Sequence, residues 1–121
     1  MNYTFLGQND SIVYIKSEGI LITDSQSALD LMMTVKYETD CTRIVIDKEA
    51  IIEDFFKLSS GIAGEVMQKF INYHIKLAIV GDFSKYTSKP LQDFIYECSK
   101  GHNIFFVDNL DLAVEKLFSA N

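Results

Sequence analysis

The fold is decided by one stretch, which reads Arg43-Ile44-Val45-Ile46 followed by Asp47-Lys48-Glu49-Ala50-Ile51-Ile52-Glu53-Asp54-Phe55-Phe56-Lys57-Leu58-Ser59-Ser60-Gly61-Ile62-Ala63-Gly64-Glu65. An apolar run with an acid at its end is typical of a central parallel strand whose carboxyl end opens into a loop. Ser59 stands at the expected N-cap of the next helix, where its hydroxyl would face the positive end of the helix dipole. We therefore expect the functional site in this stretch.

Strands and helices alternate on the carboxyl side of this stretch. The predicted elements are a strand at 43–47, a helix at about 59–73, a strand at 76–81, a helix at about 89–99, a strand at 103–107 and a helix at 110–118. Ser88 and Asn109 are expected to cap the last two helices, and Gly101 follows the first of these. The alternation predicts βαβ units and a mostly parallel sheet.

The amino-terminal third has a different pattern. Apolar and β-branched residues at 3–6 and 12–15 surround a turn-rich break at 7–11, which predicts a β-hairpin. A helical stripe follows at 25–37, capped by Asp24 or Ser25, with four apolar residues on one face: Ala28, Leu31, Met32 and Val35. We expect a single α/β domain over residues 1–121, with an N-terminal β-hairpin and a mainly parallel central sheet flanked by about four helices.

Composition narrows the class of protein. The chain has 121 residues, 48% of them hydrophobic, and a formal net charge of −6. This acidity disfavours binding to nucleic acid or to an anionic membrane surface. Two cysteines form no disulfide framework, and the apolar runs are far shorter than the roughly 20 residues of a membrane-spanning helix. We expect a cytoplasmic protein without a membrane segment or a signal peptide.

The order of elements and the segment 56–64 resemble the STAS family, which includes bacterial anti-sigma-factor antagonists and cytoplasmic domains of transporters. The resemblance covers roughly residues 10–118 and extends to the strand at 76–81 and the closing strand at 103–108. It implies a STAS-like fold in which Ser59 corresponds to the phosphorylated serine and is followed by Ser60 and Gly61, while Leu58 replaces the aspartate that usually precedes that serine.

The chain also resembles a small bacterial family described as a domain of unknown function. Four segments carry this second resemblance: Tyr37-Glu38-Thr39, Asp47-Lys48-Glu49-Ala50, Glu53-Asp54-Phe55-Phe56 and Gly81-Asp82-Phe83. It implies no activity.

Two interpretations of the serine pair stay open. Ser59 or Ser60 is a candidate phosphoacceptor, because a phosphate at a helix N-terminus meets free backbone N–H groups. An N-cap alone also explains a serine here, since capping contributes about 1 kcal/mol.

Acidic residues follow each parallel strand. Asp47, Asp82 and Asp108 stand at strand ends, and Glu49 lies in the first loop, so their carboxylates could gather and hold Mg²⁺ or Ca²⁺. Alternatively, these acids cap the turns that follow the strands. The two histidines lack zinc-site spacing, and we expect no cofactor.

Aromatic residues are concentrated in the predicted loops. A candidate partner-binding surface consists of Glu53, Asp54, Phe55, Phe56, Gly61, Phe83 and Tyr86. The aromatic rings could instead fold back over the end of the sheet, or mediate homodimerisation. We predict a non-catalytic, cytoplasmic regulatory or protein-interaction module, switched by serine phosphorylation, with an unidentified protein partner. Its expected recognition surface is the acidic and aromatic region around residues 47–61 and 82–88. The alternatives are a small-ligand or metal-binding domain and, third, an acid–base enzyme using Asp47 or Glu49.

Overall fold

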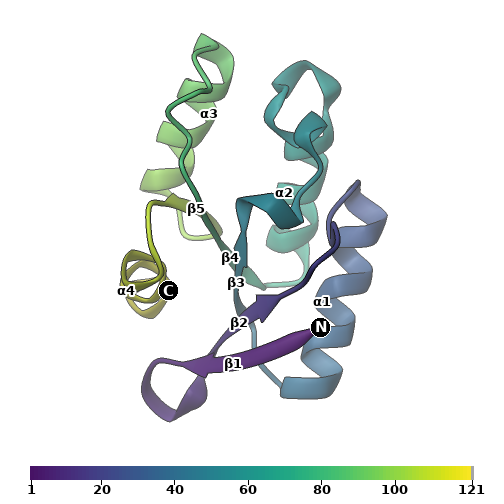
Figure 1. The fold of residues 1–121 in the computed structure, drawn as a ribbon, viewed down its shortest axis with the longest axis vertical. Helices are drawn as coiled ribbons and strands as arrows, with labels where there is room; N and C mark the ends of the chain where they lie inside the picture. Colours follow the sequence, from purple (N-terminus) through teal and green to yellow (C-terminus); the bar gives the residue numbers. More distant parts are fainter. Residues whose placement is uncertain (121) are drawn as a thin grey trace.

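The computed structural model describes residues 1–120, and they form a mixed α/β domain (Figure 1). One sheet has the strand order β1-β2-β3-β4-β5, and the strands are Asn2–Leu6, Ile12–Lys16, Arg43–Asp47, Lys76–Val80 and Ile104–Val107. β1 pairs antiparallel with β2, and each later strand pairs in parallel with the one before it. The predicted N-terminal hairpin and mainly parallel sheet are confirmed.

Helices cover both faces of the sheet. They are α1 (Ser25–Thr39), α2 (Ile62–Asn72), α3 (Lys89–Lys100) and α4 (Leu110–Ser119). Buried residues of α1, α2 and α3 share one hydrophobic cluster with one face of the sheet, whereas α4 packs in a second cluster on the other face. Figure 1 shows α1 and α2 to the right of the strands and α4 to the left. The four predicted helices are thus present.

The two-residue period of the strands explains these two clusters. In β2, Val13 and Ile15 belong to the α1–α3 side and Ile12 belongs to the α4 side, because successive side chains point to opposite faces. β3 repeats the pattern with Ile44 on the first side and Val45 on the second. A strand buried on both faces must be apolar throughout, which is why β3 and β4 show continuous apolar runs.

Three helix starts follow the sequence signals. The Asp24 carboxylate accepts a hydrogen bond from the Ser27 amide at 2.8 Å, and the Ser27 hydroxyl accepts one from the Asp24 amide, which completes a capping box. Ser88 and Asn109 cap α3 and α4 through the amides of Leu91 and Leu112. Each cap satisfies an amide that the first turn of a helix leaves unpaired.

The start of α2 differs from the prediction. The helix begins at Ile62 with Gly61 as its N-cap, in a left-handed conformation with φ of 82°, and not at Ser59. Leu58–Ser60 forms a short 3-10 turn instead. Glycine tolerates this conformation because it has no Cβ, so the chain reverses direction at Gly61 before the helix starts. Ser59 is therefore not the helix cap.

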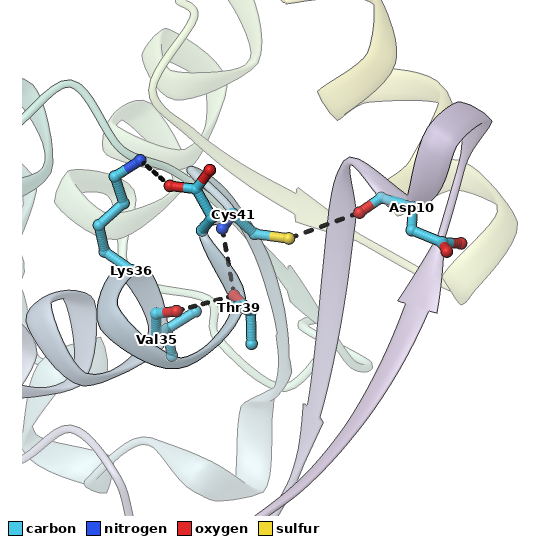
Figure 2. Close-up of polar contacts among 6 residues, drawn as sticks. Asp10, Val35, Lys36, Thr39 and Cys41 are labelled. Carbon is cyan, nitrogen blue, oxygen red and sulfur yellow. Dashed lines mark hydrogen bonds and ion pairs between the residues drawn. The ribbon is translucent and has the colours of Figure 1, made fainter.

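The turn between α1 and β3 is fixed by side-chain contacts (Figure 2). Asp40 has a φ of 61° and forms an ion pair with Lys36 at 2.6 Å. The Thr39 hydroxyl accepts a hydrogen bond from the Cys41 amide at 3.1 Å, and the Cys41 thiol donates to the Asp10 carbonyl oxygen at 3.5 Å. These contacts connect the end of α1 to the β1–β2 turn.

Among residues 1–120, none of the helices combines the length and the apolar character that crossing a membrane requires.

Candidate functional site

The segment 48–60 lies at the carboxyl end of β3 and is held in place by main-chain hydrogen bonds. The Leu21 amide donates to the Ala50 carbonyl oxygen at 2.7 Å, and the Ile52 amide donates to the Ile22 carbonyl oxygen at 2.9 Å. Ile22 and Ile51 form an isolated parallel bridge. The loop that the sequence predicted is thus an ordered segment anchored to the residues before α1.

Two phenylalanines in this segment belong to the core. Phe55 is 0% exposed and Phe56 is 4% exposed, with ring centroids 5.0 Å apart in an edge-to-face arrangement. Phe55 also approaches Phe106 of β5, at 6.5 Å between centroids. For Phe55, the predicted alternative of folding back over the end of the sheet is the one observed. The expectation that Phe55 itself contacts a partner is wrong, because no part of its side chain reaches solvent.

Tyr86 joins the segment 48–60 to the loop after β4. Its ring stacks on Phe56 with centroids 4.8 Å apart and an interplanar angle of 18°. Its hydroxyl donates to the two carboxylate oxygens of Glu53 at 2.8 and 3.0 Å, and Lys85 forms an ion pair with Glu53 at 3.2 Å. The hydrogen bond from Tyr86 lowers the pKa of Glu53, while partial burial and the Glu53 carboxylate raise the pKa of Tyr86.

A glycine and a lysine make a second close contact beside Tyr86. A Cβ atom added to Gly81 would lie 2.7 Å from the Cβ atom of Lys48, so glycine is needed at the end of β4. The ammonium group of Lys48 lies 5.4 Å from the centroid of the Tyr86 ring, within the range of a cation–π interaction. Lys48 therefore stabilises the Tyr86 ring from one side.

Tyr86 lies between two surface hollows. The first, which we name the Tyr86 groove, has a volume of about 450 Å³ and is lined by Glu53, Asp54, Phe56, Lys57, Leu58, Ser59, Tyr86, Ser88 and Pro90. The second has a volume of about 390 Å³ and is lined by Phe83, Ser84, Tyr86, Gln92, Ile95, Tyr96 and Ser99. Of the seven predicted partner-binding residues, four line the Tyr86 groove and Phe83 lines the second hollow, whereas Phe55 and Gly61 line neither.

The two candidate phosphoacceptors differ in what their hydroxyls do. The Ser60 hydroxyl donates to the Asp54 carbonyl oxygen at 2.7 Å and accepts a hydrogen bond from the Ile62 amide at 3.2 Å. Ser59 is exposed in the wall of the Tyr86 groove, and its hydroxyl has no hydrogen-bond partner within residues 1–120. Gly61 is exposed and follows the two serines in a left-handed conformation.

The acidic residues at the strand ends accept hydrogen bonds from different donors. Asp47 accepts hydrogen bonds from the Tyr14 hydroxyl at 2.8 and 2.7 Å, whereas Asp82 caps its own turn by accepting one from the Ser84 amide at 2.9 Å. Glu49 and Asp108 are exposed. Within the described part of the chain, no three His, Cys, Asp or Glu residues form a group that could hold a metal ion.

The predicted region around residues 47–61 and 82–88 contains the whole lining of the groove except Pro90. Sequence reasoning did not single out Leu58 and Ser88 in that lining, nor Lys85, which pairs with Glu53, nor Lys48, which lies over the Tyr86 ring. The helix-start signal at Ser88-Lys89-Pro90 was visible in the sequence, but its position beside the segment 48–60 depends on the tertiary fold.

The fold and the site define a mixed α/β domain with a surface groove at the carboxyl end of its sheet. The chain belongs to the family described as "Domain of unknown function (DUF4180)", whose model matches residues 7–117. The predicted membership in a family of unknown function is thereby confirmed. No curated protein and no solved structure matches the chain.

Proposed function

We propose that this chain is a non-catalytic regulatory module that binds a protein partner at the Tyr86 groove and is switched by phosphorylation of Ser59. The observation that carries the proposal is the position of an exposed, unbonded serine hydroxyl in the wall of a largely apolar groove. The two features belong to the same surface, so a modification at Ser59 changes what the groove can bind.

The composition of the groove suits a protein partner. Phe56, Leu58, Tyr86 and Pro90 supply apolar surface, and Asp54 contributes a charged edge. Interfaces have this composition, with an aromatic and apolar centre inside a polar rim. An apolar side chain of a partner would pack in this groove against Leu58, Tyr86 and Pro90.

Contacts within the chain hold the walls of the groove in place. The stacking of Tyr86 on Phe56, the hydrogen bonds to Glu53 and the ion pair with Lys85 fix its walls. A preformed surface loses less conformational entropy on binding than a mobile one. The conformational entropy lost on binding would therefore come mainly from the partner.

Phosphorylation of Ser59 would make the apolar wall of the groove polar and negatively charged. A phosphate adds about −1.5 to −2 charges at neutral pH and carries a shell of water into an otherwise apolar wall. Asp54 lines the same groove, so the added charge would also meet a carboxylate. We expect phosphorylation to release a partner that binds through apolar contacts.

The topology supports the same proposal. Ligands of open α/β sheets bind in a crevice where the strand order reverses. In the sheet formed by residues 1–120 the order runs in one direction from β1 to β5, which favours recognition on the surface over catalysis in a cleft. We also propose that the fold is STAS-like, since the order of strands and helices along the chain agrees with that resemblance.

Site-specific photo-crosslinking in cells of the source tests where the partner binds. A photoreactive residue replaces Lys57 in the groove or, as the control, Tyr37 on the exposed side of α1. We expect a discrete adduct from position 57 that is absent from position 37 and is reduced at least several-fold in the Ser59→Asp variant. Equal adducts from both positions, or no adduct from position 57, would contradict the proposal. A mass equal to two copies of the chain would identify the partner as a second copy.

Mass spectrometry of the chain purified from the same cells tests the switch. Phosphate is expected on Ser59 and not on Ser60, because the Ser60 hydroxyl is hydrogen-bonded on both sides. If the cells yield the crosslinked adduct but Ser59 is unmodified under every growth condition tried, the docking surface is retained and the phosphorylation switch is ruled out.

A further inference from the structure

β1 forms one edge of the sheet, and its outer side has no strand beside it within residues 1–120 (Figure 1). Phe5 is 43% exposed, and Asn2 and Thr4 are also exposed. The helix α4 packs mainly on β3, β4 and β5, so this end of the sheet is left open on that face. The outer side of an edge strand presents unpaired N–H and C=O groups, so β1 offers main-chain hydrogen-bonding groups to a partner.

β1 has none of the features by which natural sheets protect an edge strand. Its sequence, Asn2-Tyr3-Thr4-Phe5-Leu6, contains no charged residue and no proline. All five residues pair with β2 in one unbroken register, so the strand contains no bulge. Charged residues, proline and bulges are the usual means of preventing a further strand from pairing with an edge. The edge is therefore open to another strand.

The opposite edge of the sheet is covered. In β5, Ile104, Phe105 and Val107 are each at most 6% exposed. Ile104 belongs to the cluster of α1, α2 and α3, whereas Phe105 and Val107 belong to the cluster of α4, so helices flank β5 on both faces. Helices that cover an edge strand limit its pairing. Of the two edges, β1 is therefore the one that is accessible to a further strand.

Charge complementarity favours a second copy of this chain as the occupant. Two copies that each carry a formal charge of −6 repel each other unless they meet through an uncharged surface. Lys16, opposite Asn2, already pairs with Asp47 at 3.5 Å, and Glu38 accepts a hydrogen bond from the Tyr3 hydroxyl. In a two-fold contact the same residues meet each other, so the uncharged strand avoids bringing like charges together.

The order of side chains in β1 is self-complementary. When two copies run antiparallel with Thr4 opposite Thr4, Tyr3 of each copy lies opposite Phe5 of the other. Tyr3 and Phe5 share the face of the sheet that carries α1, since their partners in β2, Ile15 and Val13, belong to that cluster. Aromatic pairs directly opposite each other stabilise antiparallel strands. The dimer would contain two such pairs on one face.

We propose that two copies of this chain associate through β1, with the strands antiparallel and Thr4 opposite Thr4, so that their two sheets become continuous. Two strands of five residues bury less surface than the roughly 1,200 Å² at the lower limit of stable interfaces, so the dimer is in reversible equilibrium with the monomer. β1 shares no residue with the Tyr86 groove, so either proposal can fail without the other.

Disulfide trapping of the full chain tests the pairing and its register. Directly opposed Cα atoms of an antiparallel pair lie about 4.5–5.5 Å apart, within reach of a disulfide bond. Under a mild oxidant, Thr4→Cys should give a covalent dimer in high yield, whereas Asn2→Cys, which faces Leu6 of the other copy, should give several-fold less. Tyr96→Cys on the exposed side of α3 is the control for random collision. The native cysteines are buried, so the wild type should give no covalent dimer.

Sedimentation equilibrium measures the association without a crosslink. The average mass of the wild type should rise with protein concentration from that of one chain toward that of two. Thr4→Lys places two ammonium groups opposite each other and should weaken dimerisation at least several-fold, while Tyr96→Lys adds the same charge on α3 and should leave dimerisation unchanged. Thr4 and Tyr96 are both exposed, and circular dichroism checks that the variants are folded.

Three results would overturn the proposal. A wild-type mass of one chain at every concentration would exclude the dimer, and a dimer that persists unchanged in Thr4→Lys would place the interface on another surface. Disulfide yields that are equal for Thr4→Cys and Tyr96→Cys, or higher for Asn2→Cys than for Thr4→Cys, would exclude the antiparallel register centred on Thr4.

Discussion

The Tyr86 hydroxyl donates to the two carboxylate oxygens of Glu53, at 2.8 and 3.0 Å, across a sequence separation of 33 residues. This contact closes one end of the Tyr86 groove, because Glu53 belongs to the segment after β3 and Tyr86 to the loop after β4. Lys85 pairs with the same carboxylate at 3.2 Å. The shape of the groove therefore depends on a few polar contacts between two loops.

Removing this hydroxyl should destabilise the fold modestly. We expect Tyr86→Phe to lower the free energy of unfolding by about 1 kcal/mol, since a hydrogen bond to a charged group is lost while the stacked ring is retained. Urea denaturation followed by circular dichroism measures the change. The control is Tyr96→Phe, because Tyr96 is 59% exposed and its substitution should leave the free energy of unfolding within about 0.5 kcal/mol of the wild type. Equal effects of the two substitutions would show that the Glu53 contact contributes nothing.

The same contact predicts a pH dependence. The Tyr86 hydrogen bond, with smaller contributions from Lys85 and Lys48, lowers the pKa of Glu53 in the folded state. A lowered pKa contributes stability that is present above the unfolded pKa and is lost as the pH falls through the folded pKa. The stability difference between wild type and Tyr86→Phe should therefore shrink on acidification below the usual glutamate range. A difference that stays constant between neutral and strongly acidic pH would contradict this assignment.

Two glycines should respond to alanine in opposite directions. Gly81→Ala places a Cβ atom 2.7 Å from the Lys48 Cβ, and we expect a loss of about 1–3 kcal/mol from overpacking. Gly64 lies exposed inside α2 with nothing within 4 Å of the added Cβ, so Gly64→Ala should stabilise the fold by about 0.5–1 kcal/mol.

A double variant tests the cause of the Gly81 effect. Lys48→Gly removes the opposing Cβ, so Gly81→Ala should cost less in the Lys48→Gly background than in the wild type. Thermal unfolding of the four proteins gives the coupling free energy. Additive effects would show that the Gly81 substitution acts through something other than the contact with Lys48.

Alanine substitutions of the two adjacent serines should differ in their effect on the free energy of unfolding. Ser60→Ala leaves the Asp54 carbonyl oxygen and the Ile62 amide without their side-chain partner, and we expect a loss of about 1 kcal/mol. Ser59→Ala removes an exposed hydroxyl and should stay within about 0.5 kcal/mol of the wild type. The same urea series measures both variants. A larger loss for Ser59→Ala would mean that its hydroxyl is structurally engaged, which weakens the case for a modifiable residue.

Local patterns in the sequence were sufficient to predict most of the strands and helices. The apolar run at 44–46 predicted a strand because a strand buried on both faces must be apolar throughout. The stripe in α1, from Ala28 to Val35, predicted which side of that helix is buried. Ser88 was predicted as a cap because capping uses a side chain and amides only a few residues apart.

The site depended on contacts that no local pattern contains. Phe55 was a candidate for the partner-binding surface, with folding back over the end of the sheet as the alternative, and it is buried against Phe106, a residue far away in the sequence. The Asp47 carboxylate was a candidate metal ligand, and in the structure it contacts Tyr14 and Lys16 on the neighbouring strand.

The sequence by itself determined the strands, the helices and most of their caps, because apolar periodicity and capping act over a few residues. Only the tertiary structure decided that α2 starts after Gly61, that Ser59 is exposed while Ser60 is bonded, and that β1 lies at an edge of the sheet. Which side chains face each other across the ends of a sheet is set by the packing of segments distant in the chain. Burial and hydrogen bonding of a loop residue depend on those neighbours and not on its own sequence context.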